Sequence, residues 1–227
     1  MTLLHTRRFS SWARGHLVCR VENVLDRFAL TFDDGPNPGA TPRILDALAR
    51  RGAFATFFVL APNVRRHPHL IRRMRGEGHE VAAHGDRHWP LPLLPPPLIR
   101  REVLRCSAAV CAAGGLRPVL YRPPFGFMMP GQSGYVGRLG FTSVLGDVYP
   151  EDAQNPGVER IVRRVASRLA GGSILILHDG SPLRGIERQQ TVDALELILD
   201  DATRSGLRAV TVTELLEAER ESSGARP

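Results

Sequence analysis

The sequence predicts an α/β fold in which a parallel sheet is covered by helices. Short apolar segments alternate with longer amphipathic segments along the 227 residues, which is typical of repeated βα units. No internal repeat and no linker divides the chain, so we expect a single domain. A closed barrel and an open, doubly wound sheet both fit this pattern.

Seven short segments are predicted to form the strands of this sheet. They are apolar and often rich in aromatic or β-branched residues, which favours buried strands. In chain order they are residues 28–32, 54–60, 80–83, 119–121, 141–145, 173–177 and 209–212. We expect the domain to cover residues 28–219, with residues 1–27 as an appended N-terminal segment and residues 220–227 as a C-terminal tail.

Helices are predicted between these strands, where apolar residues recur every three or four positions. They cover about residues 42–51, 64–76, 98–113, 131–139, 158–169, 187–204 and 214–219. The helix ends carry recognisable signals. Thr41 and Asn63 are expected to be N-caps, and Pro42 suits the first position of a helix.

The positive charge of the chain comes from arginine alone. There are 30 Lys+Arg and 23 Asp+Glu residues, the net charge is +7, and the sequence contains no lysine. A basic surface can attract anionic partners, but these arginines are scattered in pairs and no nucleic-acid-binding motif is present. We therefore expect no nucleic acid partner and interpret the charge as a compositional bias of the source genome.

Cysteine usage and apolar segment lengths predict where the protein works. Cys19, Cys106 and Cys111 are odd in number and form no CxxC pair, which favours a reducing compartment over a disulfide framework. Residues 7–9 (RRF) faintly resemble an export signal, but charged residues interrupt the stretch that follows. With no signal peptide and no apolar run of about 18 residues, we predict a cytoplasmic location and no membrane span.

Two aspartates follow the first predicted strand, within residues 31–36 (TFDDGP). Adjacent side chains at a strand end point in different directions, so one carboxylate of Asp33 and Asp34 can bind a metal while the other stays free as a base. The glycine and proline that follow turn the chain away sharply. Taken alone, such a motif is more often a turn with solvated aspartates.

Two histidines follow the third predicted strand, within residues 84–88 (HGDRH). His84 and His88 are four residues apart, so both can reach one ion from the same face if the segment is helical. Together with one carboxylate of the first motif they make three protein ligands, which leaves open positions for water and substrate. This set predicts a catalytic metal site.

Three weaker motifs follow later strands. Residues 121–126 (YRPPFG) hold Arg122, which could pair with a carboxylate, and backbone N–H groups that could face an oxyanion. Residues 146–152 (GDVYPED) are acidic and could position the arginine or tune a histidine. His178, within residues 178–180 (HDG), suits general-acid chemistry near neutral pH. Each motif alone also fits an ordinary loop or a capping histidine.

All five motifs follow a predicted strand at its C-terminal end. In parallel α/β folds these strand ends share one edge of the sheet, and active sites form there. Unrelated solvated loops would have to place all five polar clusters at that edge by chance. We therefore expect one site that is built from all of them.

With these motifs in this order, residues 28–212 resemble the polysaccharide deacetylase family, that is, the NodB homology domain of carbohydrate esterase family 4. The TFDDGP element is the most specific part, and the later HxxxH, RxPFG and LHD elements reinforce it. The resemblance implies a distorted (β/α)7 barrel, which decides between the two possible sheet closures. It also implies that residues 28–219 form a NodB-homology deacetylase domain.

The resemblance also implies a role for particular residues. Asp33 would be the general base, and Asp34, His84 and His88 would bind a divalent metal ion, most often Zn²⁺. Arg122 would orient the base, and the backbone N–H of Phe125 would help form an oxyanion hole. His178 would be the general acid, and Asp152 would support either the arginine or this acid.

These roles imply a metal-dependent hydrolase that removes an N-linked acetyl group from an amino-sugar-containing substrate, such as an N-acetylated sugar or glycan. Two alternatives stay open: a metal-dependent O-acetyl esterase that acts on glycans, and a non-catalytic glycan-binding domain. Three positions depart from the family pattern. Gly85 replaces a usual Ser or Thr, and Tyr149 and Ala153 replace a common Asp and Trp. The missing Trp leaves the shape of the substrate groove open.

Overall fold

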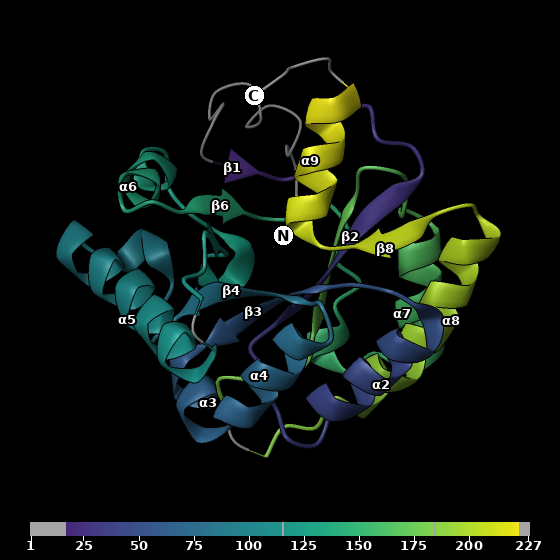
Figure 1. The fold of residues 1–227 in the computed structure, drawn as a ribbon, viewed down its shortest axis with the longest axis horizontal. Helices are drawn as coiled ribbons and strands as arrows, with labels where there is room; N and C mark the ends of the chain where they lie inside the picture. The colour runs from purple at the N-terminus through teal and green to yellow at the C-terminus, as the bar shows by residue number, and fades with distance from the viewer. Residues whose placement is uncertain (1–16, 115, 184, 223–227) are drawn as a thin grey trace.

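A sheet of eight parallel strands forms the centre of the computed structural model, which describes residues 17–114, 116–183 and 185–222 (Figure 1). Seven strands lie in the order β1-β6-β5-β4-β3-β2-β7, and β8 pairs with β2. The strands are β1 (Leu17–Val18), β2 (Arg27–Asp33), β3 (Thr56–Leu60), β4 (Glu80–Gly85), β5 (Leu120–Tyr121), β6 (Thr142–Val144), β7 (Ile174–His178) and β8 (Arg208–Val210). Because the strand pairs are parallel, their C-terminal ends lie at the same edge.

Helices connect the strands and surround the sheet (Figure 1). The α-helices are α2 (Thr41–Arg51), α3 (Ala61–Arg66), α4 (Pro68–Gly76), α5 (Pro96–Gly114), α6 (Gln132–Arg138), α7 (Val158–Ala166), α8 (Gln189–Arg204) and α9 (Val212–Ser222). Short 3₁₀ turns lie in the loops at η1 (Leu91–Leu93), η2 (Pro124–Gly126) and η3 (Asp152–Gln154). In Figure 1, α2, α7 and α8 lie together on one side of the sheet, and α5 lies on the other.

A contact between the segment after β6 and strand β7 closes the sheet into a barrel. Val148 forms a parallel bridge with Leu175, and its carbonyl oxygen accepts the N–H of Ile176 at 2.9 Å. The ring therefore runs from β6 through β5, β4, β3 and β2 to β7, and back to the segment after β6. The predicted distorted (β/α)7 barrel, formed by a single domain, is confirmed, and the open doubly wound sheet is not formed.

Strand β2 shows how the sequence specifies the two faces of the barrel wall. Side chains alternate along a strand, so Phe28 and Phe32 point outward into the main apolar core, which includes residues of α2 and α8. Each such burial contributes about 1.5–3 kcal/mol relative to exposure. Ala29 belongs to the second apolar cluster, which includes residues of α9. Thr31 and Asp33 continue on the face of Ala29, and so the inner face becomes polar toward the C-terminal edge.

The predicted helix over residues 64–76 is divided into α3 and α4. His67, between the two helices, is not helical (φ −131°, ψ 54°), because the residue before a proline is disfavoured in the helical region and Pro68 begins α4. The prediction of Asn63 as an N-cap is wrong, since this residue lies inside α3. Its side-chain amide instead donates a hydrogen bond to the backbone carbonyl of Asp34 at 2.6 Å.

The described part of the N-terminal segment contributes to the sheet. Strand β1 pairs with β6 along both of its residues. Val21 is buried, and its N–H donates to the carbonyl of Gly172 at 2.9 Å. The predicted domain boundaries stay a prediction, and residues 1–16 and 223–227 lie outside the described residues.

Two observations bear on the predicted cellular location. No helix in the described ranges 17–114, 116–183 and 185–222 is long and apolar enough to cross a membrane. Cys19, Cys106 and Cys111 are free thiols. The cytoplasmic location itself stays a prediction.

Candidate active site

Four strand ends bring predicted site residues to one edge of the barrel. Asp33 ends β2 and pairs in register with His178, the last residue of β7. His84 lies one residue before the end of β4, and Arg122 directly follows β5. The structure thus gathers these motifs at the edge that the parallel topology predicts.

Asp34, His84 and His88 place three metal-binding atoms within 4.8 Å of one another. Oδ1 of Asp34 lies 3.5 Å from Nε2 of His84 and 3.2 Å from Nε2 of His88. In a tetrahedral zinc site with bonds of about 2.0–2.1 Å, neighbouring ligand atoms lie about 3.3 Å apart, so this spacing fits one ion. Oδ1 of Asp34 is also buried without a hydrogen-bond donor, a condition that a cation would relieve.

The surroundings of both imidazoles suit metal binding. Nδ1 of His84 lies 2.8 Å from the carbonyl oxygen of Arg122, which can only accept. His84 therefore carries a proton on Nδ1, and Nε2 is the atom that can bind a metal ion. Burial and the neighbouring His84 lower the pKa of His88 to about 4, so that this imidazole is neutral at neutral pH.

The two histidines do not lie on a helix, the condition under which their spacing alone would place both on one face. His84 lies in β4, and the chain then turns through Gly85, whose φ is 115°, to His88, whose φ is 56°. Positive φ angles of this kind belong to turns, and the turn replaces the helix as the way both rings reach one point. Asp34 also has a positive φ, of 72°, which separates its side chain from that of Asp33.

Asp33 is held by a buried arginine. Nη1 of Arg122 donates to Oδ1 of Asp33 and to Oγ1 of Thr31, both at 2.7 Å. Nη2 donates to the backbone carbonyl of Leu145 at 2.7 Å, and the guanidinium carbon lies 4.0 Å from the ring centroid of Phe58. Burial acts to raise the pKa of Asp33, but the attraction of Arg122, with smaller contributions from His84 and His178, outweighs burial and holds this pKa below its ordinary value. Asp33 is therefore a carboxylate at neutral pH.

His178 is held by the buried carboxylate of Asp152. Nδ1 of His178 donates to Oδ1 of Asp152 at 2.9 Å, and the backbone N–H of His178 donates to Oδ2 at 2.8 Å. The hydroxyl of Thr191 donates to the same Oδ2 at 2.8 Å. Burial acts to lower the pKa of His178, but Asp152 overcomes this effect and the pKa rises to about 9. Of the two partners that the sequence allowed for Asp152, the structure selects the histidine.

Two aromatic side chains border the site. The ring centroid of Phe125 lies 4.6 Å from that of His88, and Phe125 is 68% exposed. The role of its backbone N–H in an oxyanion hole stays a prediction. The ring centroid of Tyr149 lies 5.9 Å from that of His178. The aromatic group beside this histidine therefore comes from Tyr149, while position 153 holds only the small side chain of Ala153.

Several buried polar residues hold the motifs in place, and the sequence did not predict a role in the site for any of them. They come from different elements, and each forms a hydrogen bond with a motif residue, with its backbone or with another member of the set: Thr31, Thr41, Asn63, Glu102, Asp179, Arg188 and Thr191. Only Thr31 and Asp179 stand inside a recognised motif. A polar residue on the inward face of a buried strand was the one available signal for Thr31.

Asp179 explains the glycine of the first motif. A Cβ at Gly35 would lie 2.1 Å from Oδ2 of Asp179, so only glycine permits this approach. Asp179 is fully buried, and burial raises its pKa to about 7. Its Oδ2 accepts a hydrogen bond from the hydroxyl of Thr41 at 2.5 Å. Thr41, wrongly predicted as an N-cap, is the first residue of α2, and this bond ties α2 to the end of β7.

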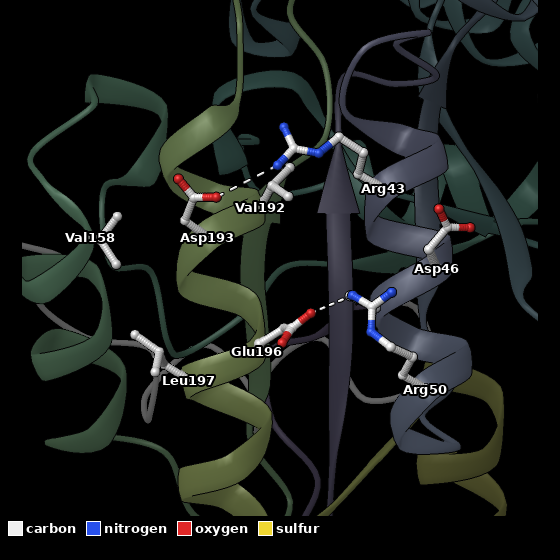
Figure 2. A pocket seen from close by; sticks show the side chains of 9 residues that line it. Arg43, Asp46, Arg50, Val158, Val192, Asp193, Glu196 and Leu197 are labelled. Atoms are coloured by element: carbon white, nitrogen blue, oxygen red, sulfur yellow. Dashed lines mark hydrogen bonds and ion pairs between the residues drawn. The ribbon is translucent and has the colours of Figure 1, made fainter.

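A separate charged groove of about 580 Å³ lies between α2 and α8 on the outside of the barrel (Figure 2). None of the predicted site residues lines it. Across the groove, Arg43 pairs with Asp193 at 3.7 Å and Arg50 pairs with Glu196 (Figure 2). Exposed pairs of this kind contribute little to stability, and their charges largely neutralise each other. The chemistry of the protein therefore belongs to the C-terminal edge of the barrel.

Comparison with known proteins decides the family. The family model described as polysaccharide deacetylase matches residues 23–144. The chain belongs to the polysaccharide deacetylase family. A peptidoglycan-N-acetylglucosamine deacetylase from Bacillus cereus is 36% identical over 204 residues, which cover 89% of this chain and 93% of the relative. A chitooligosaccharide deacetylase from Bradyrhizobium sp. is 38% identical over 194 residues, which cover 82% of this chain and 89% of the relative.

Solved structures place this polysaccharide deacetylase among proteins of one fold. The peptidoglycan deacetylase PdaC from Bacillus subtilis is 33% identical with a TM-score of 0.79, and the match covers 88% of this chain and 94% of that one. A CE4 family pseudoenzyme from Bacillus anthracis has a TM-score of 0.80 at 21% identity, over 88% of this chain and 68% of that one. The barrel alone therefore does not establish activity, and function is argued from the site. The predicted family and its enzyme class, carbohydrate de-N-acetylase, are confirmed.

Proposed function

We propose that this polysaccharide deacetylase hydrolyses the N-acetyl group of an amino-sugar-containing glycan with the help of a divalent cation, and that this cation is zinc. One observation carries the proposal. An anionic Asp33 and a cationic His178 lie in register on neighbouring strands, beside the Asp34, His84 and His88 triad. Two titratable groups whose pKa values move in opposite directions supply a base and an acid at the same pH.

Asp34, His84 and His88 would hold the cation. Two imidazole nitrogens and one carboxylate oxygen are a common donor set of catalytic zinc, and they leave positions open for water and substrate. When bound, a divalent cation supplies a Lewis acid that polarises the acetyl carbonyl and lowers the pKa of water. Mixed nitrogen and oxygen donors suit several divalent ions, so the native ion is to be identified by affinity measurements.

The other residues of the site move protons and position groups. Asp33 takes a proton from the attacking water, and Arg122 keeps it ionised and oriented. The backbone N–H of Phe125 donates to the oxyanion of the tetrahedral intermediate. His178 protonates the leaving nitrogen as the C–N bond breaks, and Asp152 stabilises the imidazolium before this transfer. The products are acetate and a free amino sugar.

The substrate class follows from the relatives and from the aromatic border of the site. The relatives are named for peptidoglycan-N-acetylglucosamine and for chitooligosaccharides, so we propose a glycan that contains N-acetylglucosamine. The rings of Phe125 and Tyr149 offer apolar faces beside His88 and His178, and sugar rings pack on such faces.

Replacement of the base tests the proposal directly. Asp33→Asn removes the base but keeps an oxygen that can accept from Arg122. We expect acetate release to fall by about 10²–10⁴-fold. Zinc binding should persist, because Asp34, His84 and His88 are unchanged. The measurements are acetate release from chitin oligomers and peptidoglycan with added zinc, and zinc affinity by competition with a chelator.

An aspartate outside the site provides the control. Asp147 lies in the acidic loop, but its carboxylate accepts the N–H of Ile174 and pairs with Arg20. Asp147→Asn should keep most of the activity. The proposal fails if Asp33→Asn retains wild-type activity, or if zinc-loaded wild type releases no acetate from any N-acetylated glycan. Acetate release from acetylxylan but not from chitin oligomers would assign an O-acetyl esterase instead.

A further inference from the structure

The turn that carries the two histidines is attached to α5 through one buried carboxylate. Oε2 of Glu102 accepts the backbone N–H of Asp86 at 3.0 Å and that of Arg87 at 2.7 Å. Glu102 is 1% exposed. The two donors lie between His84 and His88 in a bend outside the strands and helices, so no sheet or helix partner satisfies them.

We propose that Glu102 is a positioning residue for the metal site. Its carboxylate fixes the turn that brings Nε2 of His88 toward Nε2 of His84 and Oδ1 of Asp34. The inference rests on the proposed function only in that these three residues bind the cation. Two hydrogen bonds to one charged oxygen make a firm attachment, and groups that orient metal ligands in this way contribute to metal affinity.

Gly85 gives this carboxylate its close approach. The residue has a φ of 115°, a conformation that residues with a side chain rarely adopt. A Cβ at position 85 would lie 3.3 Å from Oε2 of Glu102, closer than an ordinary contact. The glycine and the carboxylate therefore fit each other, and together they replace a hydroxyl side chain as the means of holding the turn.

Packing alone does not account for a carboxylate at position 102. Oε1 of Glu102 is buried and has no hydrogen-bond partner, so the whole polar role of the side chain passes through Oε2. A half-satisfied carboxylate in the interior carries a desolvation penalty that an apolar side chain avoids. The side chain of Asp86, in the same turn, is also fixed, since its carboxylate pairs with Arg65 at 2.6 Å and with Arg105 at 3.6 Å. The turn is thus fixed through both backbone and side chain between α3 and α5.

The other end of β4 offers a matched control. Glu80 begins β4, and its Oε2 accepts the hydroxyl of Thr56 at 2.7 Å and the N–H of Thr213 at 3.2 Å. This carboxylate also joins a helix to the strand, but it lies at the opposite end of β4 from the histidines. Glu80→Gln and Glu102→Gln therefore make the same chemical change, and only the second lies next to the metal ligands.

The experiment measures zinc affinity rather than turnover. Full-length wild type, Glu102→Ala, Glu102→Gln and Glu80→Gln are titrated with zinc against a chromophoric chelator, and denaturant unfolding of the metal-free proteins checks their folding. We expect zinc affinity to fall about 10–100-fold in Glu102→Ala. The loss should be smaller in Glu102→Gln, because a neutral amide oxygen can still accept both hydrogen bonds. Glu80→Gln should stay within about twofold of wild type.

The results of these titrations decide the inference. It is overturned if both Glu102 variants bind zinc within about twofold of wild type, or if Glu80→Gln loses as much affinity as Glu102→Gln. If Glu102→Ala does not fold, the comparison of the two glutamine variants decides in the same way. A wild type that binds no zinc contradicts the proposed metal site itself. A wild type whose zinc affinity equals that of the Glu102 variants contradicts only the role of Glu102.

Discussion

The two buried ion pairs of the site are built from opposite parts. In the Arg122–Asp33 pair the proposed working group is the carboxylate, and in the Asp152–His178 pair it is the imidazole. The supporting member is the more deeply buried one in both pairs. The side chains of Arg122 and Asp152 are 0% exposed, whereas those of Asp33 and His178 are 7% and 13% exposed. In each pair a fully buried charged side chain therefore supports the charge of the more exposed partner.

The two pairs move two pKa values apart by the same attraction. Burial acts to raise the pKa of Asp33, but Arg122, helped by His84 and His178, brings this pKa below its ordinary value. Burial acts to lower the pKa of His178, but Asp152 raises it to about 9. At neutral pH the base is therefore deprotonated while the acid is protonated. The charged partners, rather than burial of the two groups, therefore determine that His178 is protonated and Asp33 is not.

Replacement of Arg122 should have the largest effect. Arg122→Met leaves Asp33 as a buried charge without its partner, so we expect the free energy of unfolding to fall by about 3–5 kcal/mol. The pKa of Asp33 should rise because burial is then opposed only by the weaker attraction of His84 and His178. The acid limb of kcat/KM should move to higher pH, and activity at neutral pH should fall about 10²–10⁴-fold. Denaturant unfolding without metal and a pH–rate profile measure these effects.

Arg122→Lys sharpens the same comparison. A lysine keeps the charge, but one ammonium group cannot reproduce the fork that contacts Asp33, Thr31 and the carbonyl of Leu145. The acid limb should therefore move less than in Arg122→Met, although activity still falls. An acid limb that moves in neither variant would show that Arg122 does not set the pKa of Asp33.

Replacement of Asp152 should have the next largest effect. In Asp152→Asn the pKa of His178 should fall from about 9 toward its ordinary 6.5, because burial is then opposed only by the weaker attraction of Asp33 and Asp34. A drop to 6.5 reduces the protonated fraction at pH 8 about 30-fold. The basic limb of kcat/KM should move to lower pH by the same shift. A basic limb that stays in place would contradict the assignment of His178 as the acid.

The Asp152→Asn variant also changes how stability depends on pH. The pKa of His178 in the folded protein, about 9, lies above its ordinary value of 6.5. The pair therefore stabilises the fold fully below pH 6.5, and this contribution is lost as the pH rises through about 9. Denaturant unfolding on either side of this window should show the loss in wild type. The variant should lack it, and an equal loss in both proteins would contradict the pairing.

The sequence predicted which residues belong to the two ion pairs better than it predicted which residue pairs with which. Asp33 and His178 could be predicted because each ends an apolar strand and belongs to a residue type that moves protons. Asp152 was assigned to either the arginine or the acid. The choice depends on the register of β2 with β7 and on the turn at η3, which a single sequence does not reveal. Strand ends were therefore predictable, and contacts between distant segments were not.

Turns and buried braces were the least predictable parts of the site. The spacing of His84 and His88 would place both rings on one face of a helix, but a turn with a positive φ at Gly85 brings the rings together instead. The departure at Gly85 was visible in the sequence, yet its counterpart Glu102 lies on α5 and is found only when that helix packs on the strand. Asn63 likewise looked like a helix cap from its local sequence. Its contact with the backbone of Asp34 comes from tertiary packing, which overrides local signals.

Two threonines give the smallest expected effect and the finest test of the comparison. Oγ1 of Thr31 accepts from Arg122, and Oγ1 of Thr191 donates to Asp152, so each hidden charge has one hydroxyl partner. Thr31→Val and Thr191→Val keep the side-chain shape but remove this hydrogen bond, and Thr31→Val also removes the bond that its hydroxyl donates to the carbonyl of Leu175 at 2.7 Å. Each should lower the free energy of unfolding by about 1–3 kcal/mol.

Neither threonine variant should move a limb of the pH–rate profile, because the buried charge stays in place. Their kcat/KM should fall less than that of Arg122→Met or Asp152→Asn, since only the orientation of the supporting residue changes. The two pH–rate profiles are the decisive measurement. If Thr191→Val shifted the basic limb as far as Asp152→Asn does, the pKa of His178 would depend on how Asp152 is oriented rather than on its charge. The parallel between the two pairs would then hold for their contacts but not for their electrostatics.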